Sequence, residues 1–270
     1  MNERIRQYWE DRARTYAGLS AATTDDVYLR ELEIRTVTQT LCGLDVPTNS
    51  SVLDLGCGDG YSTLRVARGF PDFCFLGVDY SQGMIENAQA RLKAEPELRG
   101  RVSFISGDVL QLSELLGIGA YDVVLTDRCL INLDSVADQS EAIAQVATQT
   151  KPRGFYVAIE NFTEGHENMN KARSAVGVPE IPVRWHNLYF REREFVQSAE
   201  RFFEVIELAD FASSYYFATR VIYSAMCQMR GEKPDYQHDI HKLAVNLPPF
   251  GQFSPIRMAV LRRKTTNQNP

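Results

Sequence analysis

The residue types best suited to chemistry stand in the segment 52–60, where an apolar run ends in an acidic residue and a glycine-rich turn. Asp54 directly precedes the turn, and Gly56 and Gly58 lack the Cβ atoms that restrict the backbone. Because a helical pattern follows, this turn joins a strand to a helix and would leave its N–H groups open to a bound molecule. The pattern predicts a ligand site in which Cys57 fills space rather than acts as a nucleophile.

The position of the third glycine separates two classes of ligand. A dinucleotide fingerprint has the form G-x-G-x-x-G, but Tyr61 occupies the last glycine position and Gly60 comes one residue early. Asp59 adds a negative charge where a pyrophosphate would lie. An acidic surround favours a cationic ligand without phosphate, such as S-adenosylmethionine. The first two strands would also suit an NAD-dependent oxidoreductase, which is the alternative from another class.

Acidic residues also follow three further apolar strands, at Asp79, Asp108 and Asp127. Together with the glycine-rich turn, these strand ends resemble the motifs of the class I S-adenosylmethionine-dependent methyltransferase family in their order along the chain. The resemblance implies that Asp79 binds the ribose hydroxyls, that Asp108 meets the adenine and that Asp127 lies at the methyl-donor end. The cofactor contacts expected from it are Tyr16, Asp54, Gly56, Cys57, Gly58, Asp79, Tyr80, Met84, Asp108, Val109, Asp127 and Arg128.

The segment 1–45 precedes the first strand and has the apolar spacing of helices. Its stretch from Tyr8 to Tyr16 resembles the helical start of many small-molecule methyltransferases, where an aromatic side chain closes over the cofactor. Tyr16 is the candidate for that role, with plain packing as the alternative. We therefore expect a helical lid.

Strand and helix patterns alternate from the first strand onward, with a helix expected at Ser140–Thr150 and a turn at Lys151–Gly154. This alternation predicts an α/β fold with a Rossmann-like doubly wound sheet of seven mostly parallel strands, covered by helices on both faces. The family resemblance adds that the seventh strand runs antiparallel between the fifth and sixth. The expected parts of a single domain are the lid 1–45, the cofactor-binding core 46–160, the substrate-binding inserts 161–200 and 212–252, and the last strands 203–211 and 253–264.

The two inserts are long and rich in Trp, Tyr, Arg, Asn and His, which suits stacking and hydrogen bonding to a polar molecule. They would overhang the cofactor's methyl group, because ligands of such sheets bind at the carboxyl ends of the strands. The predicted substrate contacts are Asn132, Asn161, Arg173, Trp185, Tyr189, Tyr215 and Arg220.

A hydroxyl acceptor must lose its proton during methyl transfer, and histidine suits that task near neutral pH. His186, between Trp185 and Asn187, is the first candidate for the base, and His166 is the second. An amine or carboxylate acceptor would need little or no base, in which case both histidines only shape the pocket.

Composition excludes several classes of protein. The formal net charge of -6 opposes a nucleic-acid surface, and no segment has the roughly 20 apolar residues that span a bilayer. Five scattered cysteines without paired spacing fit a reducing, cytoplasmic location. We expect no bound metal, because His238 and His241 have no evident set of carboxylate partners. A homodimer is left open.

These observations predict a cytoplasmic methyltransferase that uses S-adenosylmethionine to modify a small polar metabolite. The expected acceptor is a hydroxyl of a sugar, sugar nucleotide or natural product, and the nearest alternative is N-methylation of an amino sugar or amine. A non-catalytic cofactor-binding subunit would keep the same strand-end residues but show no turnover with any acceptor. A methyltransferase of protein or RNA would need a broad or basic docking surface. The acidic balance weighs against RNA.

Overall fold

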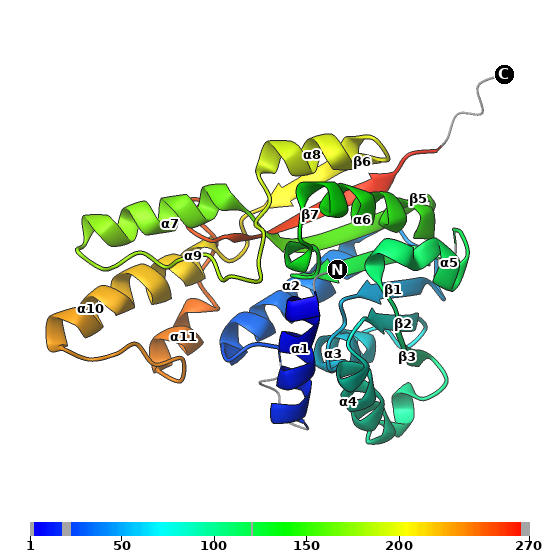
Figure 1. The fold of residues 1–270 in the computed structure, drawn as a ribbon, viewed down its shortest axis with the longest axis horizontal. Helices are drawn as coiled ribbons and strands as arrows, with labels where there is room; N and C mark the ends of the chain where they lie inside the picture. The colour runs from blue at the N-terminus through cyan, green and yellow to red at the C-terminus, as the bar shows by residue number, and fades with distance from the viewer. Residues whose placement is uncertain (1–2, 18–22, 120, 266–270) are drawn as a thin grey trace.

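A computed structural model describes residues 3–17, 23–119 and 121–265, and its centre is one sheet of seven strands (Figure 1). The strands are β1 Ser51–Leu55, β2 Cys74–Asp79, β3 Val102–Ser106, β4 Tyr121–Asp127, β5 Thr150–Asn161, β6 Phe203–Ala209 and β7 Ile256–Arg263. The α-helices are α1 Glu3–Thr15, α2 Val27–Gly43, α3 Tyr61–Arg68, α4 Gln82–Lys93, α5 Leu112–Leu116, α6 Val136–Gln149, α7 Thr163–Ala175, α8 Glu192–Glu200, α9 Ser213–Tyr216, α10 Tyr223–Arg230 and α11 Asp239–Ala244.

The strands follow the order β3-β2-β1-β4-β5-β7-β6 across the sheet. The first five are parallel to one another, whereas β7 pairs antiparallel with both β5 and β6. The predicted fold class and the predicted place of the last strand are therefore confirmed. Because the order reverses at β1, the ends of β1 and β4 diverge there and leave a crevice for a ligand.

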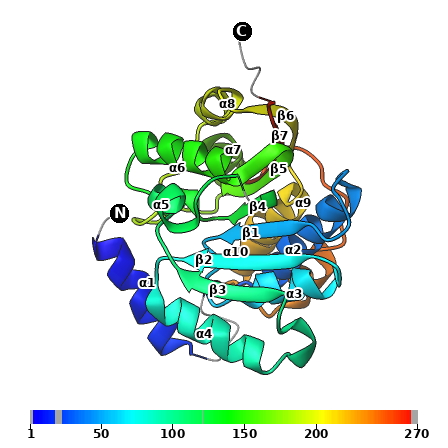
Figure 2. The same cartoon turned by 90° about the vertical axis from the view of Figure 1, so that its right-hand side faces the viewer.

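Successive strand residues point to opposite faces, and each face has its own core. Val52 and Val123 belong to the core under α2, α3 and α4, and their neighbours Leu53 and Val124 belong to the core under α5, α6 and α8. Figure 2 shows these helices on the two sides of the sheet. Burial on both faces explains why the strands read as continuous apolar runs rather than as alternating ones.

Two local predictions were wrong. Lys151–Gly154, expected as a turn, lies inside β5, with a register shift against β4 and a positive φ of 65° at Arg153. This irregularity resembles a turn in its residue types, because proline and glycine are common in both. Helix α6 begins at Val136 rather than at Ser140, since the Ser135 side chain caps it by accepting from the Asp138 N–H at 3.0 Å.

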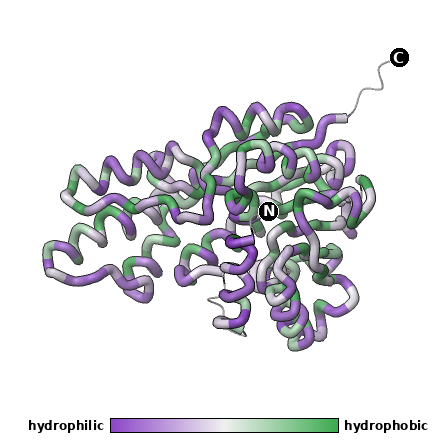
Figure 3. The backbone as a smooth tube through the Cα atoms, viewed as in Figure 1, coloured by the Kyte–Doolittle hydropathy of each residue, from purple (hydrophilic) through white to green (hydrophobic). Residues whose placement is uncertain are grey.

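The inserts form a helical group beyond one end of the sheet, where α7, α9, α10 and α11 lie together on the left of Figure 1. A π-helical segment, Phe217–Ile222, joins α9 to α10. Hydrophilic and hydrophobic residues alternate along these helices (Figure 3), as in helices that bury one side. Among the helices of the described residues, none has both the length and the apolar content needed to cross a bilayer.

Candidate functional site

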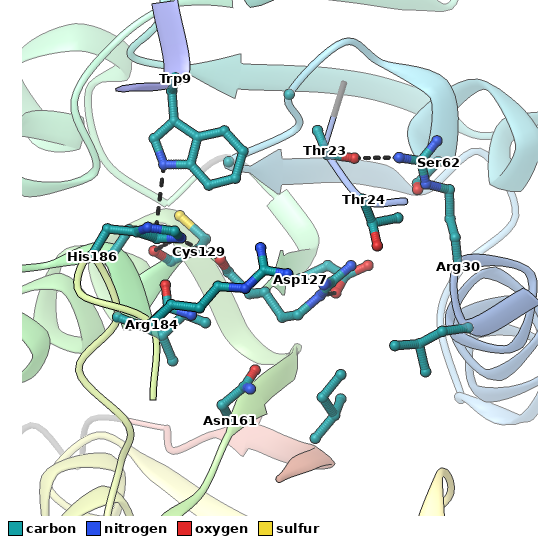
Figure 4. Close-up of a pocket in the computed structure, with 18 of the residues that line it drawn as sticks. Trp9, Thr23, Thr24, Arg30, Ser62, Asp127, Cys129, Asn161, Arg184 and His186 are labelled. Carbon is teal, nitrogen blue, oxygen red and sulfur yellow. Dashed lines mark hydrogen bonds and ion pairs between the residues drawn. The ribbon is translucent and has the colours of Figure 1, made fainter. Parts of the chain in front are cut away.

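A cavity of about 270 Å³ lies at the carboxyl ends of β1, β2 and β4, beside the first insert (Figure 4). The strands contribute the glycine-rich turn and the acidic side chains, and the segment 181–189 covers the opposite wall. Trp9 of α1 closes a further side, because its Nε1 donates to Asn132 Oδ1 at 3.3 Å. The cavity therefore gathers three parts of the chain that are far apart in sequence.

Most of the predicted site residues line this cavity. From the cofactor set these are Asp54, Gly56, Cys57, Gly58, Asp79, Tyr80, Met84, Val109, Asp127 and Arg128. From the substrate and base sets they are Asn132, Asn161, His166, His186, Tyr189 and Arg220. Their proximity agrees with a common site, and the role of each is still a prediction.

Two predicted cofactor contacts are not among the lining residues. The Asp108 carboxylate accepts from the Leu110 N–H at 2.9 Å and so caps the turn that follows β3. Tyr16 lies 4.6 Å from the Arg12 guanidinium and packs beside Met84. Both side chains thus interact with nearby protein groups. The sequence alone did not distinguish such contacts from ligand binding.

Three predicted substrate contacts also lie outside the cavity wall. Arg173 donates from Nε to the Pro179 carbonyl at 2.8 Å and ties the insert together. Trp185 is 52% exposed and stacks edge-on against His186. The Tyr215 hydroxyl donates to Asp26 at 2.6 Å, inside a buried network. Arg173 and Tyr215 thus bond to the protein itself, whereas Trp185 is largely exposed beside His186.

The glycine-rich turn does not leave its N–H groups open, as the sequence had suggested. The N–H groups of Gly56 and Cys57 donate to the Val78 carbonyl at 2.8 and 3.2 Å, and that of Gly58 donates to Asp79 Oδ2 at 2.9 Å. Glycine is needed at position 56 because φ is 70° and a Cβ would lie 2.6 Å from Cys129 Sγ. The turn thus fixes the end of β2 rather than cradling an anion.

Asp59 does not act as the free negative charge assumed from the sequence. It is buried, and its Oδ2 accepts from Arg91 Nη2 at 2.8 Å. The pair neutralises the carboxylate, so repulsion of a phosphate by Asp59 is not an argument against a dinucleotide.

Asp79 and Asp54 form the acidic end of the cavity. Asp79 accepts from the N–H groups of Gly58 and Ser81, both at 2.9 Å, which orients its carboxylate at the tip of β2. Burial raises its pKa to about 6, although these two hydrogen bonds oppose the shift. Burial raises the pKa of Asp54 to about 7, against a hydrogen bond from Thr63. A cationic ligand would lower both values and bind more tightly as the acids ionise.

Arg128 follows β4 with a positive φ of 54° and holds two acidic groups. Its Nη2 lies 3.0 Å from Glu33 Oε2, and its Nε lies 3.6 Å from Asp127 Oδ1. Glu33 is fully buried on α2, and burial raises its pKa. Sequence reasoning missed Glu33, although a charged residue on the apolar face of α2 is a signal that it has a partner.

His186 is packed among aromatic rings at the edge of the cavity. Its ring stacks on Tyr8 at 4.5 Å between centroids and meets Trp9 edge-on at 5.8 Å. Burial, together with the charges of Arg184 and Arg12, lowers its pKa to about 4. The imidazole is therefore neutral at pH 7 and is a weak proton acceptor, which opposes the predicted role as general base.

The second candidate base, His166, lies on α7 beside Asn170, whose Nδ2 is 3.2 Å from His166 Nε2. Burial lowers its pKa as well. Its Nδ1 is buried without a hydrogen-bond partner in the described structure, as is Asn161 Oδ1 at the end of β5. Both residues line the cavity, so these atoms are positioned to meet a bound molecule.

The described residues contain no group of three or more His, Cys, Asp or Glu side chains that could hold a metal ion. His238 caps α11, accepting from the Ile240 N–H at 3.1 Å, and stacks on Tyr223 at 4.4 Å. His241 Nδ1 lies 2.7 Å from the Tyr215 hydroxyl. The two histidines thus have separate structural partners.

Comparison with known proteins identifies the family of the chain. A methyltransferase domain model matches residues 48–190, which is more than half of the chain. The chain therefore belongs to the family of class I S-adenosylmethionine-dependent methyltransferase domains.

Two curated relatives match parts of the chain. Malonyl-[acyl-carrier protein] O-methyltransferase of Halalkalibacterium halodurans is 29% identical over 47% of this chain and 46% of its own length. Demethylmenaquinone methyltransferase of Leptospira interrogans is 36% identical over 40% of this chain and 42% of its own. The chain thus spans less than half the length of these relatives, whose names give different acceptors.

A solved structure with the same fold covers almost the whole chain. Magnesium protoporphyrin IX methyltransferase of Synechocystis PCC 6803, with S-adenosylhomocysteine bound, aligns over 96% of this chain and 98% of its own. The TM-score is 0.62 and the identity is 16%, so this likeness concerns the fold.

Proposed function

We propose that the protein transfers a methyl group from S-adenosylmethionine to an oxygen of a small polar acceptor. The observation that supports this most directly is that strand-end residues of the cofactor-binding core and polar residues of the first insert line the same cavity. A cofactor at the acidic end would then present its methyl group to an acceptor held by the insert.

In this proposal Asp79 binds the ribose hydroxyls, because its carboxylate is oriented by two N–H donors and stands at the end of β2. Asp54 and Asp127 provide negative charge for the ammonium and sulfonium groups. Methyl transfer is an in-line displacement, so the main tasks of the protein are alignment of the acceptor and exclusion of water. Trp9 serves the second task by covering the cavity near Asn132.

The positive charge at the acceptor end supports an oxygen acceptor that carries negative charge. Arg184 lines this end, and a protonated amine beside its guanidinium would be repelled. An ionised oxygen needs no base, which suits the low pKa of His186. A sugar, sugar nucleotide or natural product with an ionised oxygen agrees with the polar lining of the cavity. All five cysteines are unpaired, which agrees with a reducing cytoplasm.

Isothermal calorimetry with S-adenosylhomocysteine, S-adenosylmethionine and NAD tests the cofactor site. Asp79→Asn should weaken binding of both sulfur ligands by about 10-fold or more, since it removes the charged acceptor for the ribose hydroxyls. Asp72→Asn, on an exposed turn, is the matched control and should leave binding unchanged. Preference for NAD, or failure of the wild-type protein to bind either sulfur ligand, would contradict the proposal.

A further inference from the structure

Among the described residues, four arginines line the cavity, and they differ in how their charge is balanced. Arg128 pairs with Glu33 and Asp127, and Arg220 pairs with Asp26. Arg30 donates to Thr23 Oγ1 at 2.5 Å and lies over the Tyr61 ring. These three cations are held by the protein itself.

Arg184 differs because, within residues 3–17, 23–119 and 121–265, no carboxylate lies within ion-pair distance of its guanidinium. Figure 4 shows its side chain pointing into the cavity. Its charge lowers the pKa of His186 and acts in the same direction on Tyr189, so the positive charge lies close to both. The acceptor end of the cavity, beside Arg184, is therefore electropositive, whereas the end formed by Asp54 and Asp79 is acidic.

Unpartnered polar atoms elsewhere in the cavity wall provide an independent observation. Three side chains of the described structure, each more than nine-tenths buried, line the cavity with a polar atom that has no partner: His166 Nδ1, His186 Nδ1 and Asn161 Oδ1. Buried polar atoms are normally hydrogen-bonded, so such a cluster indicates a ligand that supplies the missing partners. Neutral imidazoles can donate from Nδ1 to an anion, whereas Asn161 Oδ1 would accept from a hydroxyl.

We propose, resting on the methyltransferase function above, that the acceptor carries a carboxylate that forms an ion pair with Arg184. The guanidinium fork matches the planar carboxylate with two parallel hydrogen bonds. Arg184 is an exposed residue with a single charge, which one carboxylate balances. Histidines 166 and 186 then act as neutral donors beside it, and Asn161 meets a hydroxyl of the same molecule.

Intrinsic fluorescence offers a direct readout, because both tryptophans of the chain, Trp9 and Trp185, lie against His186. Protein saturated with S-adenosylhomocysteine is titrated with malonate, succinate, citrate and glucuronate, and with the methyl ester of each. Glucose 1-phosphate and UDP-glucose form the phosphate arm. We expect at least one carboxylate to bind about 10-fold more tightly than its ester and more tightly than the phosphates.

The Arg184→Gln variant should lose about 10-fold in affinity for that carboxylate and keep the wild-type affinity for S-adenosylhomocysteine. Arg193→Gln, which removes an exposed arginine on α8 outside the cavity, should change neither. Equal binding of every acid and its ester, tighter binding of the phosphates, or an unchanged Arg184→Gln variant would overturn the proposal. Failure of the wild-type protein to bind S-adenosylhomocysteine would instead contradict the proposed cofactor site. Failure of the carboxylate proposal can therefore be distinguished from failure of the proposed function.

Discussion

At the scale of single residues, the position of His186 determines what kind of chemistry the site can support. Burial and the nearby positive charges of Arg184 and Arg12 disfavour the imidazolium form. A hydroxyl acceptor would therefore have to find its base elsewhere or react through an already ionised oxygen. A histidine in this setting orients and donates rather than removes a proton.

We predict that His186 stays neutral throughout the range from pH 6 to 8. Nuclear magnetic resonance of histidine-labelled protein, with His186→Phe to assign the signal, should show titration at about pH 4, because burial opposes protonation. The chain has four histidines, so the spectrum is simple to assign. A pKa near 7 would restore His186 as a candidate base.

The acidic residues near strand ends could be predicted from sequence, because each one interrupts an apolar run directly before a turn. Glu33 and Trp9 were missed, since they reach the site from helices whose docking no local pattern encodes. Asp108 and Tyr215 have protein partners that the sequence did not indicate, and their contacts with a ligand stay predictions. Their residue types suit binding, but they satisfy protein groups that become neighbours only in the folded chain.

At the scale of elements, Gly60 allows α3 to pack closely on the neighbouring strand and helix. It has φ of 72°, and a Cβ would lie 2.8 Å from both the Ala88 Cβ and the Phe104 ring. Gly60→Ala should lower the free energy of unfolding by about 2–4 kcal/mol, as backbone strain and overpacking add. Gly100→Ala is the control, because φ is 86° with no atom within 4 Å, and we expect about 1 kcal/mol there. Urea unfolding measures both, and equal losses would show that packing is not the cause.

The second insert is joined to the start of α2 by a buried polar network. Tyr215 donates to Asp26 Oδ1, Arg220 pairs with the other oxygen, and the Asp26 side chain also caps α2 through the Leu29 N–H at 3.0 Å. The π-helical turn that carries Arg220 is a conformation common at functional sites. Asp26 and Arg220 both line the cavity, so this network positions part of its wall.

Removal of one hydroxyl from this network should reveal its contribution. Tyr215→Phe should destabilise the protein by about 1–3 kcal/mol, because Asp26 and His241 each lose a buried partner. Affinity for S-adenosylhomocysteine should change little, since Tyr215 does not line the cavity. Thermal unfolding and calorimetry report the two quantities separately, and a large loss of ligand affinity with unchanged stability would contradict this assignment.

Much of the element pattern could be predicted, because strands buried on both faces read as apolar runs and helices have a different period. The start of β5 could not be predicted, because Pro152, Arg153 and Gly154 have the composition of a turn and lie where the pairing of β5 with β4 is irregular. The arrangement of the inserts was also beyond the sequence, because their helices are short and are placed by contacts to one another rather than by periodicity.

At the scale of the whole molecule, the buried acids make stability depend on pH. Burial raises the pKa of Asp54 and of Glu160 to about 7, so the folded protein holds protons that the unfolded chain has released above pH 5. The free energy of unfolding of the ligand-free protein should therefore fall as pH rises from 6.5 to 8. His166 and His186, whose pKa values burial lowers, act in the opposite direction, and their effect fades above the ordinary imidazole value of about 6.5 as the unfolded chain also loses these protons.

Urea unfolding at pH 6.5, 7.2 and 8.0 measures this slope. Asp54→Asn should flatten it, because the variant has no carboxyl to ionise at that position. Asp72→Asn, in an exposed turn, should keep the wild-type slope. Stability that rises between pH 6.5 and 8.0 would show that these acids are ionised at lower pH than the structure indicates.

The place of β7 between β5 and β6 also bears on how the protein is made. The ribosome synthesises β5 and β6 before β7. Each of these two strands therefore has an unpaired edge until β7, which lies between them, has been synthesised. Unpaired edges invite pairing with other chains, and a nascent chain at this stage is exposed to aggregation. The second insert lies between β6 and β7, so its length delays the synthesis of β7. The length of this insert therefore affects how long the unpaired strand edges of the nascent chain are open to aggregation.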